Sequence, residues 1–207
     1  MREEKIKKQI VQYSKILDQK GLVNSLEGNL SILDRETGLM YITPTGTRKA
    51  FLTEDQVAVM KGDEQVGGTK KRSSEYILHK VALEARPDCH AVLHVHAPYM
   101  TAYAYCNKGI NLRCSTTFSI LHDDIPCIPY GEPGGYGIAK GLDKAIQGHS
   151  IVLLANHGLV CVGKDLEQAC AIVEATEEAL KIYEIAKHMG VSDLNDAQLE
   201  SLKIAKR

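Results

Sequence analysis

The chain has 207 residues, of which 44% are hydrophobic, and it carries a formal net charge of -1. This length favours one domain over residues 1–207, and the nearly balanced charge gives no reason to expect nucleic-acid or membrane partners. Six cysteines without a CxxC pair, and a charged start without an apolar leader, favour reduced thiols and a cytoplasmic protein. No apolar run approaches the roughly 20 residues of a membrane helix.

Apolar spacing predicts a helix, a hairpin and a strand in the first 60 residues. Apolar side chains recur at helical spacing over residues 2–20, and Gly21 ends the pattern. Residues 29–33 and 39–43 are β-prone runs around a Thr-Gly turn, which predicts a β-hairpin. The run QVAVM, residues 56–60, predicts a further short strand.

The middle of the chain predicts a helix followed by a strand. Ser73 or Ser74 can cap the helix of residues 73–88, with Glu75 in its first turn and a proline near its end. The strand is AVLHVH, residues 91–96, and Pro98 then favours the first turn of a helix that extends to residue 106.

Short strands dominate the expectation for the remainder of the chain. A Gly-rich turn at residues 134–137 precedes a helix to about residue 147, and a long helix begins near residue 165 and ends near residue 189. The strands are expected at residues 110–115, 125–130, 151–156 and 159–163. Most connections are too short for βαβ units, so a largely antiparallel sheet covered by helices is the expected α/β architecture.

Two histidines in the strand HAVLHVHAPY are the first candidates for chemistry. Residues two apart in a strand point to the same face, so His94 and His96 are expected to project side by side. His157 lies at an abrupt Asn-His-Gly break between two apolar strands, where a polar ring is costly unless it is used or satisfied. Three imidazoles predict a metal site, with zinc as the first choice and one coordination position left for catalysis.

A second constellation of small and hydroxyl residues can bind an anion. It comprises Gly28, Asn29, Thr45, Gly46, Ser73 and Ser74. Serines at a helix start offer free N–H groups and a favourable dipole for a phosphate, although each piece alone is also an ordinary turn or cap. Glu75 follows these serines and can act as a metal ligand or a general base, or can simply complement the helix dipole.

The motifs EGNLS, YITPTG, SSE, HAVLHVHAPY and ANHGLVCVG occur in this order. Together they resemble the class II aldolase/adducin family, and within it the L-fuculose-1-phosphate aldolases, over residues 5 to 185. The resemblance implies a three-layer α/β/α domain with a central, mostly antiparallel sheet and a C4 homotetramer with active sites between subunits. It also implies one zinc ion per subunit held by His94, His96 and His157.

The same resemblance implies the reaction and the remaining site residues. Glu75 is expected as fourth ligand without substrate and as acid/base with substrate, beside a phosphate site made by Gly28, Asn29, Thr45, Gly46, Ser73 and Ser74. The expected reaction cleaves a ketose 1-phosphate, with L-fuculose 1-phosphate as first choice, to dihydroxyacetone phosphate and L-lactaldehyde. Cleavage creates an enediolate, whose charge a zinc ion can stabilise.

Two features depart from the family pattern. An aldehyde-side tyrosine donated by a neighbouring subunit falls, by ungapped counting, near Ser115, and no tyrosine lies between residues 107 and 121. Tyr130 or Tyr136 can substitute for it. The tail after Gly190, residues 191–207, has no counterpart and is expected to form a capping helix without an assigned role.

Two kinds of alternative stay open: other enzymatic activities of the family and a non-catalytic interaction module. A pentulose-phosphate 4-epimerase uses the same retro-aldol step, but its loop resembles KPSG, whereas TPTG here lacks lysine. A methylthioribulose-phosphate dehydratase uses the same metal, and an aldolase for 5-deoxyribulose 1-phosphate has the same motifs. An adducin-like interaction module would have lost the metal ligands, which are all present here, so zinc content separates the two classes.

Overall fold

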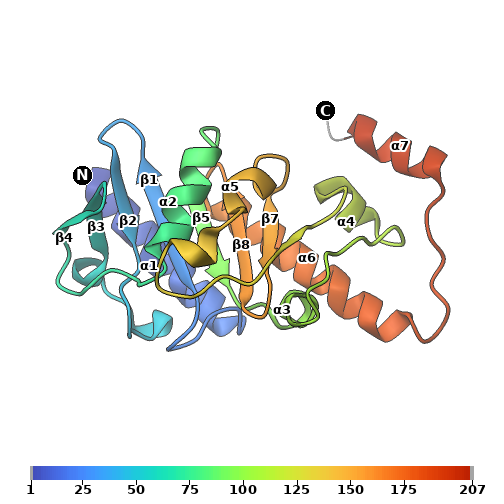
Figure 1. The fold of residues 1–207 in the computed structure, drawn as a ribbon, viewed down its shortest axis with the longest axis horizontal. Helices are drawn as coiled ribbons and strands as arrows, with labels where there is room; N and C mark the ends of the chain where they lie inside the picture. The colour runs from blue at the N-terminus through green and yellow to red at the C-terminus, as the bar shows by residue number, and fades with distance from the viewer. Residues whose placement is uncertain (1, 206–207) are drawn as a thin grey trace.

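The computed structural model describes residues 2–205, and one sheet organises them (Figure 1). Its eight strands lie in the order β4-β3-β2-β1-β5-β8-β7-β6. All neighbours pair antiparallel except β6 and β7, which are parallel. The strands are β1 (Asn29–Asp34), β2 (Leu39–Ile42), β3 (Ala58–Lys61), β4 (Glu64–Gly67), β5 (Ala91–Val95), β6 (Cys127–Ile128), β7 (Ile151–Leu154) and β8 (Gly158–Gly163).

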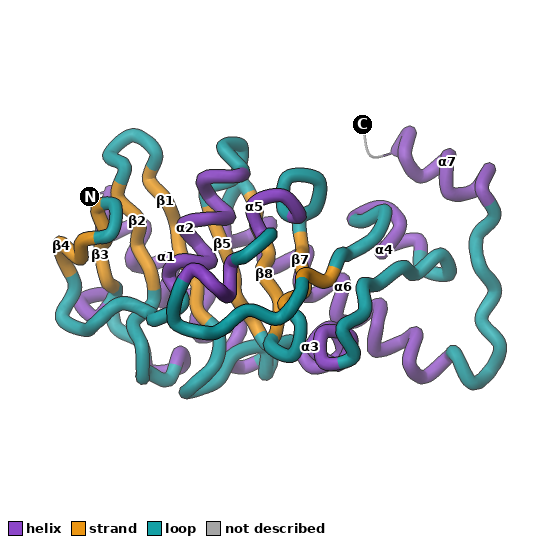
Figure 2. The backbone as a smooth tube through the Cα atoms, in the orientation of Figure 1, coloured by secondary structure: helices purple, strands orange, loops and turns teal. Residues whose placement is uncertain are grey.

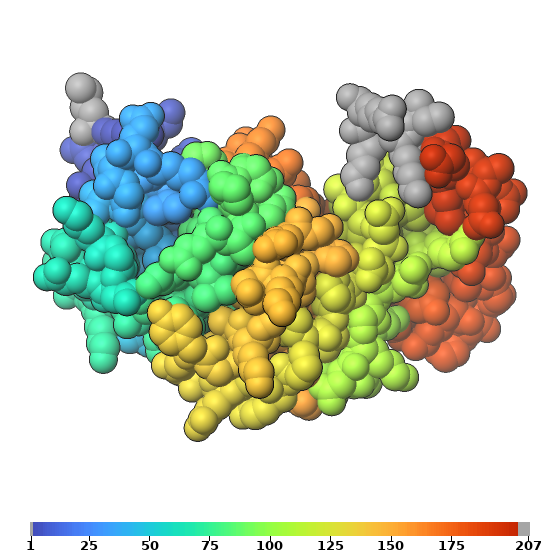
Figure 3. Space-filling view, turned by 45° about the horizontal axis from the view of Figure 1, so that its top comes forward, coloured from blue at the N-terminus to red at the C-terminus, as the bar shows by residue number. Residues whose placement is uncertain are grey.

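Helices cover both faces of this sheet, as the tube in Figure 2 shows, so the expected three-layer α/β/α architecture is confirmed. One face packs against α2 (Tyr76–Ala85), η3 (Tyr136–Ala139) and α5 (Leu142–Ala145). Figure 3 shows α2 in green beside the yellow and orange segment that carries η3 and α5. The other helices are α1 (Arg2–Gln19), α3 (Pro98–Tyr105), α4 (Thr116–Leu121), α6 (Leu166–Ala186) and α7 (Asp196–Ala205), with the short turns η1 (Lys49–Phe51) and η2 (Glu54–Gln56).

Strand alternation divides the core into two clusters and thereby positions the site. In β5, Ala91, Leu93 and Val95 belong to the core on the α1 and α6 side, whereas Val92 packs in the core beneath α2. Because side chains alternate along a strand, His94 points to the same face as Val92, toward α2. In β1, Leu30 likewise faces the α1 side. The side chains of the adjacent residues, Asn29 and Ser31, therefore point toward α2.

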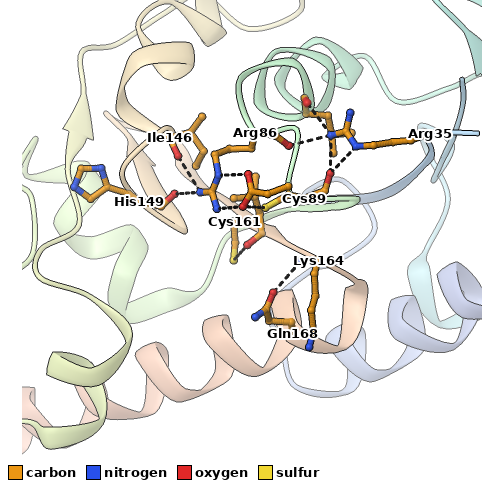
Figure 4. Close-up of polar contacts among 11 residues, drawn as sticks. Arg35, Arg86, Cys89, Ile146, His149, Cys161, Lys164 and Gln168 are labelled. Carbon is orange, nitrogen blue, oxygen red and sulfur yellow. Dashed lines mark hydrogen bonds and ion pairs between the residues drawn. The ribbon is translucent and has the colours of Figure 1, made fainter. Parts of the chain in front are cut away.

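Two arginines hold the end of α2 opposite to this site (Figure 4). Arg35 donates to the carbonyls of Leu83 (3.0 Å) and Cys89 (2.6 Å), and Arg86 donates to the His149 carbonyl (2.9 Å). Cations near the last carbonyls of a helix satisfy these acceptors and complement the helix dipole. The C-terminal end of α2 is therefore anchored to the turn after β1 and to the segment after α5.

Several sequence predictions were wrong between β5 and β7. Residues 110–115 form no strand, only an isolated bridge between Ile110 and Ile125, and the strand predicted at 125–130 shrinks to β6. Helix α4 follows instead, because the Ser115 side chain accepts the Phe118 N–H at 3.2 Å and caps it. Outside this region, the edge strand β4, at residues 64–67, was also not predicted.

The tail after Gly190 contains a helix, as expected. Leu194 donates to the Arg113 carbonyl at 3.1 Å, and the Arg113 guanidinium pairs with Asp196 at the start of α7. Helix α7 also contacts α4, beside which it lies in Figure 1. No helix within residues 2–205 has the length and apolarity to cross a membrane.

Candidate metal centre and active site

Three imidazole rings converge beneath the start of α2. The Nε2 atom of His94 lies 3.2 Å from the Nε2 atoms of both His96 and His157. One ligand atom from each of the three rings lies within 4.8 Å of the others. Two nitrogens at tetrahedral positions about 2.0–2.1 Å from a zinc ion are separated by roughly 3.3 Å. The spacing therefore fits the binding of one small divalent cation.

The local sequence explains how His157 reaches the other two rings. Asn156 adopts a left-handed conformation (φ 58°), which Asn tolerates better than most residues, and so turns the chain tightly between β7 and β8. A Cβ on Gly158 would lie 2.8 Å from the Val95 carbonyl oxygen and 3.3 Å from the His96 ring. The Asn-His-Gly sequence thus allows β8 to pass close to the end of β5.

Hydrogen bonding fixes the His94 ring in the form that ligates metals. Its Nδ1 lies 2.9 Å from the Leu159 carbonyl oxygen, which can only accept, so Nδ1 carries the proton and Nε2 keeps its lone pair. The ring is fully buried, and burial, with the nearby His96 and His157 rings, lowers the pKa of His94 to about 4 against the opposing effect of Glu75. His94 is therefore neutral at neutral pH.

Glu75 points its carboxylate at the same three rings. Its Oε1 lies 2.9 Å from His157 Nε2, and its Oε2 lies 3.3 Å from His94 Nε2. Burial would raise the pKa of this carboxyl, but the hydrogen bond from His157, the His94 ring and the hydrogen bond from Asn29 hold it well below the usual range. The group is an anion that can serve as a fourth ligand or accept a proton.

The start of α2 differs slightly from the prediction. Glu75 is itself the N-cap residue, one position before the first turn, and neither Ser73 nor Ser74 occupies the cap. The Ser73 hydroxyl instead accepts the Glu75 N–H at 3.2 Å. The Glu75 backbone is therefore held by Ser73, independently of the contacts that its carboxylate makes with the histidines.

A buried polar chain that the sequence analysis missed orients Glu75. Asn29 donates to Glu75 Oε2 at 2.8 Å, and its side-chain oxygen hydrogen-bonds His79 Nε2. The other nitrogen of His79, Nδ1, lies 2.7 Å from the Ser31 hydroxyl. Since the amide oxygen of Asn29 can only accept, His79 donates through Nε2 and accepts from Ser31. The Asn29 amide is thereby fixed with its NH₂ group toward Glu75.

Replacing His79 with leucine is expected to lower the free energy of unfolding at pH 7 by about 1–3 kcal/mol, because Asn29 and Ser31 lose a buried partner. Burial lowers the pKa of His79 to about 3, so the wild-type protein loses stability as pH falls from about 6.5 toward 3. The difference in free energy of unfolding between the wild type and His79→Leu should therefore decrease as the pH falls. Urea unfolding at pH 7 and pH 5, with the exposed His188→Leu as control, checks this, and a gap independent of pH would contradict it.

The candidate anion-binding residues occupy three neighbouring segments. The Thr45 N–H donates to the Lys71 carbonyl (3.0 Å), and the Ser73 N–H donates to the Thr43 carbonyl (3.2 Å), so the TPTG loop lies against the SSE segment. Thr45, Gly46 and Ser74 are exposed, whereas Ser73 is buried. This open edge beside the histidines suits a phosphate, and the contacts themselves stay a prediction.

Gly28 and Asn29 lie at the start of β1, next to the strand β5 that carries His94. Asn29 is the register partner of His94 in the β1–β5 pair. Gly28 has φ +83°, and a Cβ there would lie 2.5 Å from Val23 Cγ1 and 3.1 Å from the His94 carbonyl oxygen. Only glycine fits this approach without strain. The Asn29 side chain is committed to Glu75 and His79.

Ser115, Tyr130 and Tyr136 are the positions considered for an aldehyde-side tyrosine. Ser115, where the resemblance places it, is the cap of α4. Tyr130 and Tyr136 are 62% and 64% exposed and therefore accessible.

The family model of the class II aldolase and adducin N-terminal domain matches residues 8–184. The chain belongs to this family. It is 31% identical over 189 residues to a 5-deoxy-D-ribulose 1-phosphate aldolase of Bacillus thuringiensis, covering 90% of this chain and 88% of the relative. It is also 36% identical over 177 residues to an L-fuculose phosphate aldolase of Methanocaldococcus jannaschii, covering 85% and 94% of the two chains.

A solved structure of an L-fuculose 1-phosphate aldolase shares the fold of this class II aldolase-family chain. The TM-score is 0.89 at 32% identity, with 97% of this chain and 95% of the other covered. The chain is therefore a lyase of the class II aldolase family, which is metal-dependent, and the cluster of His94, His96 and His157 can hold a metal.

Proposed function

We propose that the protein is a zinc-dependent aldolase that reversibly cleaves a ketose 1-phosphate to dihydroxyacetone phosphate and an aldehyde. L-Fuculose 1-phosphate, giving L-lactaldehyde, is the first choice of substrate. The observation that carries this proposal is the convergence of His94, His96 and His157 with the Glu75 carboxylate on one point. An interaction module needs no such set of donors.

His94, His96 and His157 would hold one zinc ion per subunit, with Glu75 as the fourth ligand in the absence of substrate. When bound, zinc polarises a carbonyl oxygen and stabilises negative charge that develops there. Neutral imidazoles are the form that binds metal, and burial lowers the pKa of both His94 and His96.

Glu75 would transfer the proton of the aldol step. In the condensation direction its carboxylate removes a proton from the hydroxymethyl carbon of dihydroxyacetone phosphate, and the resulting enediolate carbon attacks the aldehyde. In the cleavage direction the C4 hydroxyl loses its proton as its carbon becomes the aldehyde, and the bond between C3 and C4 breaks with its electron pair left on C3. Protonated Glu75 would then deliver a proton to C3, so the proton lost at C4 and the proton gained at C3 balance. The hydrogen bond from Asn29 keeps the carboxylate directed at the site.

The phosphate group would be bound at the open edge formed by Gly28, Asn29, Thr45, Gly46, Ser73 and Ser74. Binding there fixes the reacting end of the substrate by orientation. Ser73 lies near the start of α2, where the helix dipole also favours an anion.

Replacing Ser73 with alanine is expected to raise KM for phosphorylated substrates about tenfold, because one hydrogen bond to a charged group is lost. Ser73 also accepts the Glu75 N–H, so the exposed Ser74→Ala serves as a second variant that keeps that bond. KM is compared for a ketose 1-phosphate and for the unphosphorylated ketose. An equal effect on both substrates would argue against a phosphate contact.

The remaining assignments follow the family. We propose a single domain over residues 1–207, a cytoplasmic homotetramer, and an active site completed by a neighbouring subunit. The tail after residue 190, which contains α7, has no proposed part in the chemistry.

Turnover against a panel of ketose 1-phosphates tests the function, with release of dihydroxyacetone phosphate as readout. The panel includes L-fuculose 1-phosphate and 5-deoxyribulose 1-phosphate, because relatives named for both sugars match most of the chain. Conversion of a pentulose 5-phosphate to its C4 epimer, without cleavage, would favour the epimerase instead. Absence of turnover on every ketose 1-phosphate would refute the aldolase assignment.

A further inference from the structure

Lys49 is a buried lysine close in sequence to the TPTG loop. It begins η1, three residues after Gly46, and only 4% of its surface is exposed. Among the side chains whose burial is described, no other Lys or Arg is buried. Its Nζ is not among the fully buried side-chain atoms that lack a hydrogen-bond partner, so the ammonium still contacts solvent at the surface of the site. A largely buried cation is normally compensated by a group of opposite charge.

Neighbouring cations make an ion pair or a hydrogen bond, whereas the Lys49 ammonium makes neither. Arg48 pairs with Asp18 at 3.0 Å, and Lys70 donates to the Thr47 hydroxyl at 3.0 Å. Within residues 2–205, the Lys49 ammonium makes no hydrogen bond and no ion pair. The buried cation therefore has capacity for an anion that the chain itself does not supply.

The electrostatics place this charge near the catalytic cluster. Burial lowers the pKa of Lys49, and the carboxylates of Glu75 and Asp18 partly oppose that effect. Lys49 in turn contributes to the lowered pKa of His96, behind the larger effect of burial. Glu75 thus acts on the Lys49 ammonium, and the ammonium acts on the His96 imidazole.

The two carboxylates that face Lys49 are already engaged elsewhere. Asp18 accepts from Arg48 and, at 3.3 Å, from the Ala50 N–H. Glu75 accepts from Asn29 and contacts His157. The Lys49 ammonium therefore has no carboxylate bound directly to it and can accept an anionic ligand.

We propose that Lys49 binds the phosphate group of the substrate. This inference rests on the proposed function and adds a residue to its binding site. The six residues proposed above for phosphate binding offer only neutral donors, whereas a sugar phosphate carries up to two negative charges. A lysine ammonium supplies three donors and the matching charge. Lys49 lies three residues after Gly46, and the Thr45-Gly46 loop itself is bonded to the SSE segment, so the lysine and the proposed phosphate residues belong to one region.

The affinity of the zinc-loaded protein for inorganic phosphate tests the proposal directly. Isothermal titration calorimetry compares the wild type with Lys49→Met, which removes the charge at similar volume, and with Lys49→Arg, which retains it. Lys71→Met, at an exposed lysine of the adjacent segment, is the matched control. We expect Lys49→Met to weaken phosphate binding about tenfold or more, and Lys71→Met to change it less than about twofold.

Unchanged phosphate affinity in a folded Lys49→Met protein would overturn the proposal, as would absence of phosphate binding to the wild type. Thermal melts and zinc content establish that the variants fold. If a variant does not fold, chemical modification of the wild-type protein tests the same proposal. Phosphate should slow acylation of Lys49 by an amine-reactive reagent relative to Lys71, mapped by mass spectrometry, and equal slowing of both would overturn the proposal too.

Failure of this inference and failure of the proposed function give different results. Phosphate binding needs no turnover, so a loss in Lys49→Met without cleavage of any ketose 1-phosphate would refute the aldolase while Lys49 retains its anion-binding role. Normal cleavage with phosphate affinity unaffected by Lys49→Met would refute only the part given to Lys49. In an active enzyme, Lys49→Met should raise KM for the ketose 1-phosphate and leave KM for the unphosphorylated ketose unchanged.

Discussion

Replacing His94 with alanine is expected to abolish aldol cleavage and to remove most of the bound zinc. His94 lies 3.2 Å from both other imidazoles, so its loss leaves only two nitrogens and breaks the set. We expect cleavage to fall by at least about a thousandfold, since removal of the metal removes the charge stabilisation on which the step depends. Metal analysis of the purified protein should give about one zinc per wild-type chain and a small fraction of that in the variant.

A control separates loss of metal from loss of fold. His94 is fully buried, so His94→Ala also creates a cavity, whereas the side chain of His96 is 11% exposed. His96→Ala should therefore lose zinc with less loss of thermal stability. His90→Ala, in the same stretch but outside the cluster, should retain both zinc and activity. Full activity of zinc-free His94→Ala protein would exclude the proposed mechanism.

Glu75→Gln is expected to keep the shape of the site and to lose most of the turnover. The amide retains a hydrogen-bonding oxygen but cannot accept the proton of the aldol step, so kcat should fall about 10²–10⁴-fold. Affinity for inorganic phosphate should change little, because the proposed anion-binding residues are intact. Initial rates of dihydroxyacetone phosphate release and calorimetric phosphate titrations measure the two quantities separately.

Glu27→Gln is the matched control for Glu75→Gln. Glu27 also lies beside the cluster, 3.7 Å from His96 Nδ1, but it is half-exposed and directed at a different ring atom. Its replacement should leave kcat within about threefold of wild type. An unchanged kcat in Glu75→Gln would rule out the acid/base role, and a large zinc loss in that variant would show that ligation dominates.

Local sequence patterns predicted most of the site because its geometry depends on short-range rules. The two-residue strand period placed His94 and His96 together, and the tight Asn-His-Gly turn marked His157. The segments proposed to bind an anion were likewise predicted as turn or cap residues. Their mutual placement came from the family resemblance, since spacing along the chain does not show which turns meet in space.

The features that were missed depend on contacts distant in sequence. His79 lies in an ordinary helical pattern, and its partners Ser31 and Asn29 lie 48 and 50 residues away on β1. Lys49 occupies a polar loop, where a lysine is normally exposed, and only the packing of η1 against α1 accounts for its burial. Residues 110–115 were predicted as a strand because they are rich in β-prone residues, and helix α4 after them was not predicted, although Ser115 caps it.

The central position of β5 has a consequence for how the protein holds its ion. This strand is bonded on one side by β1 and on the other by β8, and all five of its residues are buried. Amides in such interior strands exchange with solvent only through large-scale opening, unlike those of frayed ends. His94, which lies on this strand, should thus keep its position through ordinary breathing motions, and a metal ion bound by the proposed ligands should dissociate from the intact protein far more slowly than substrate enters and leaves.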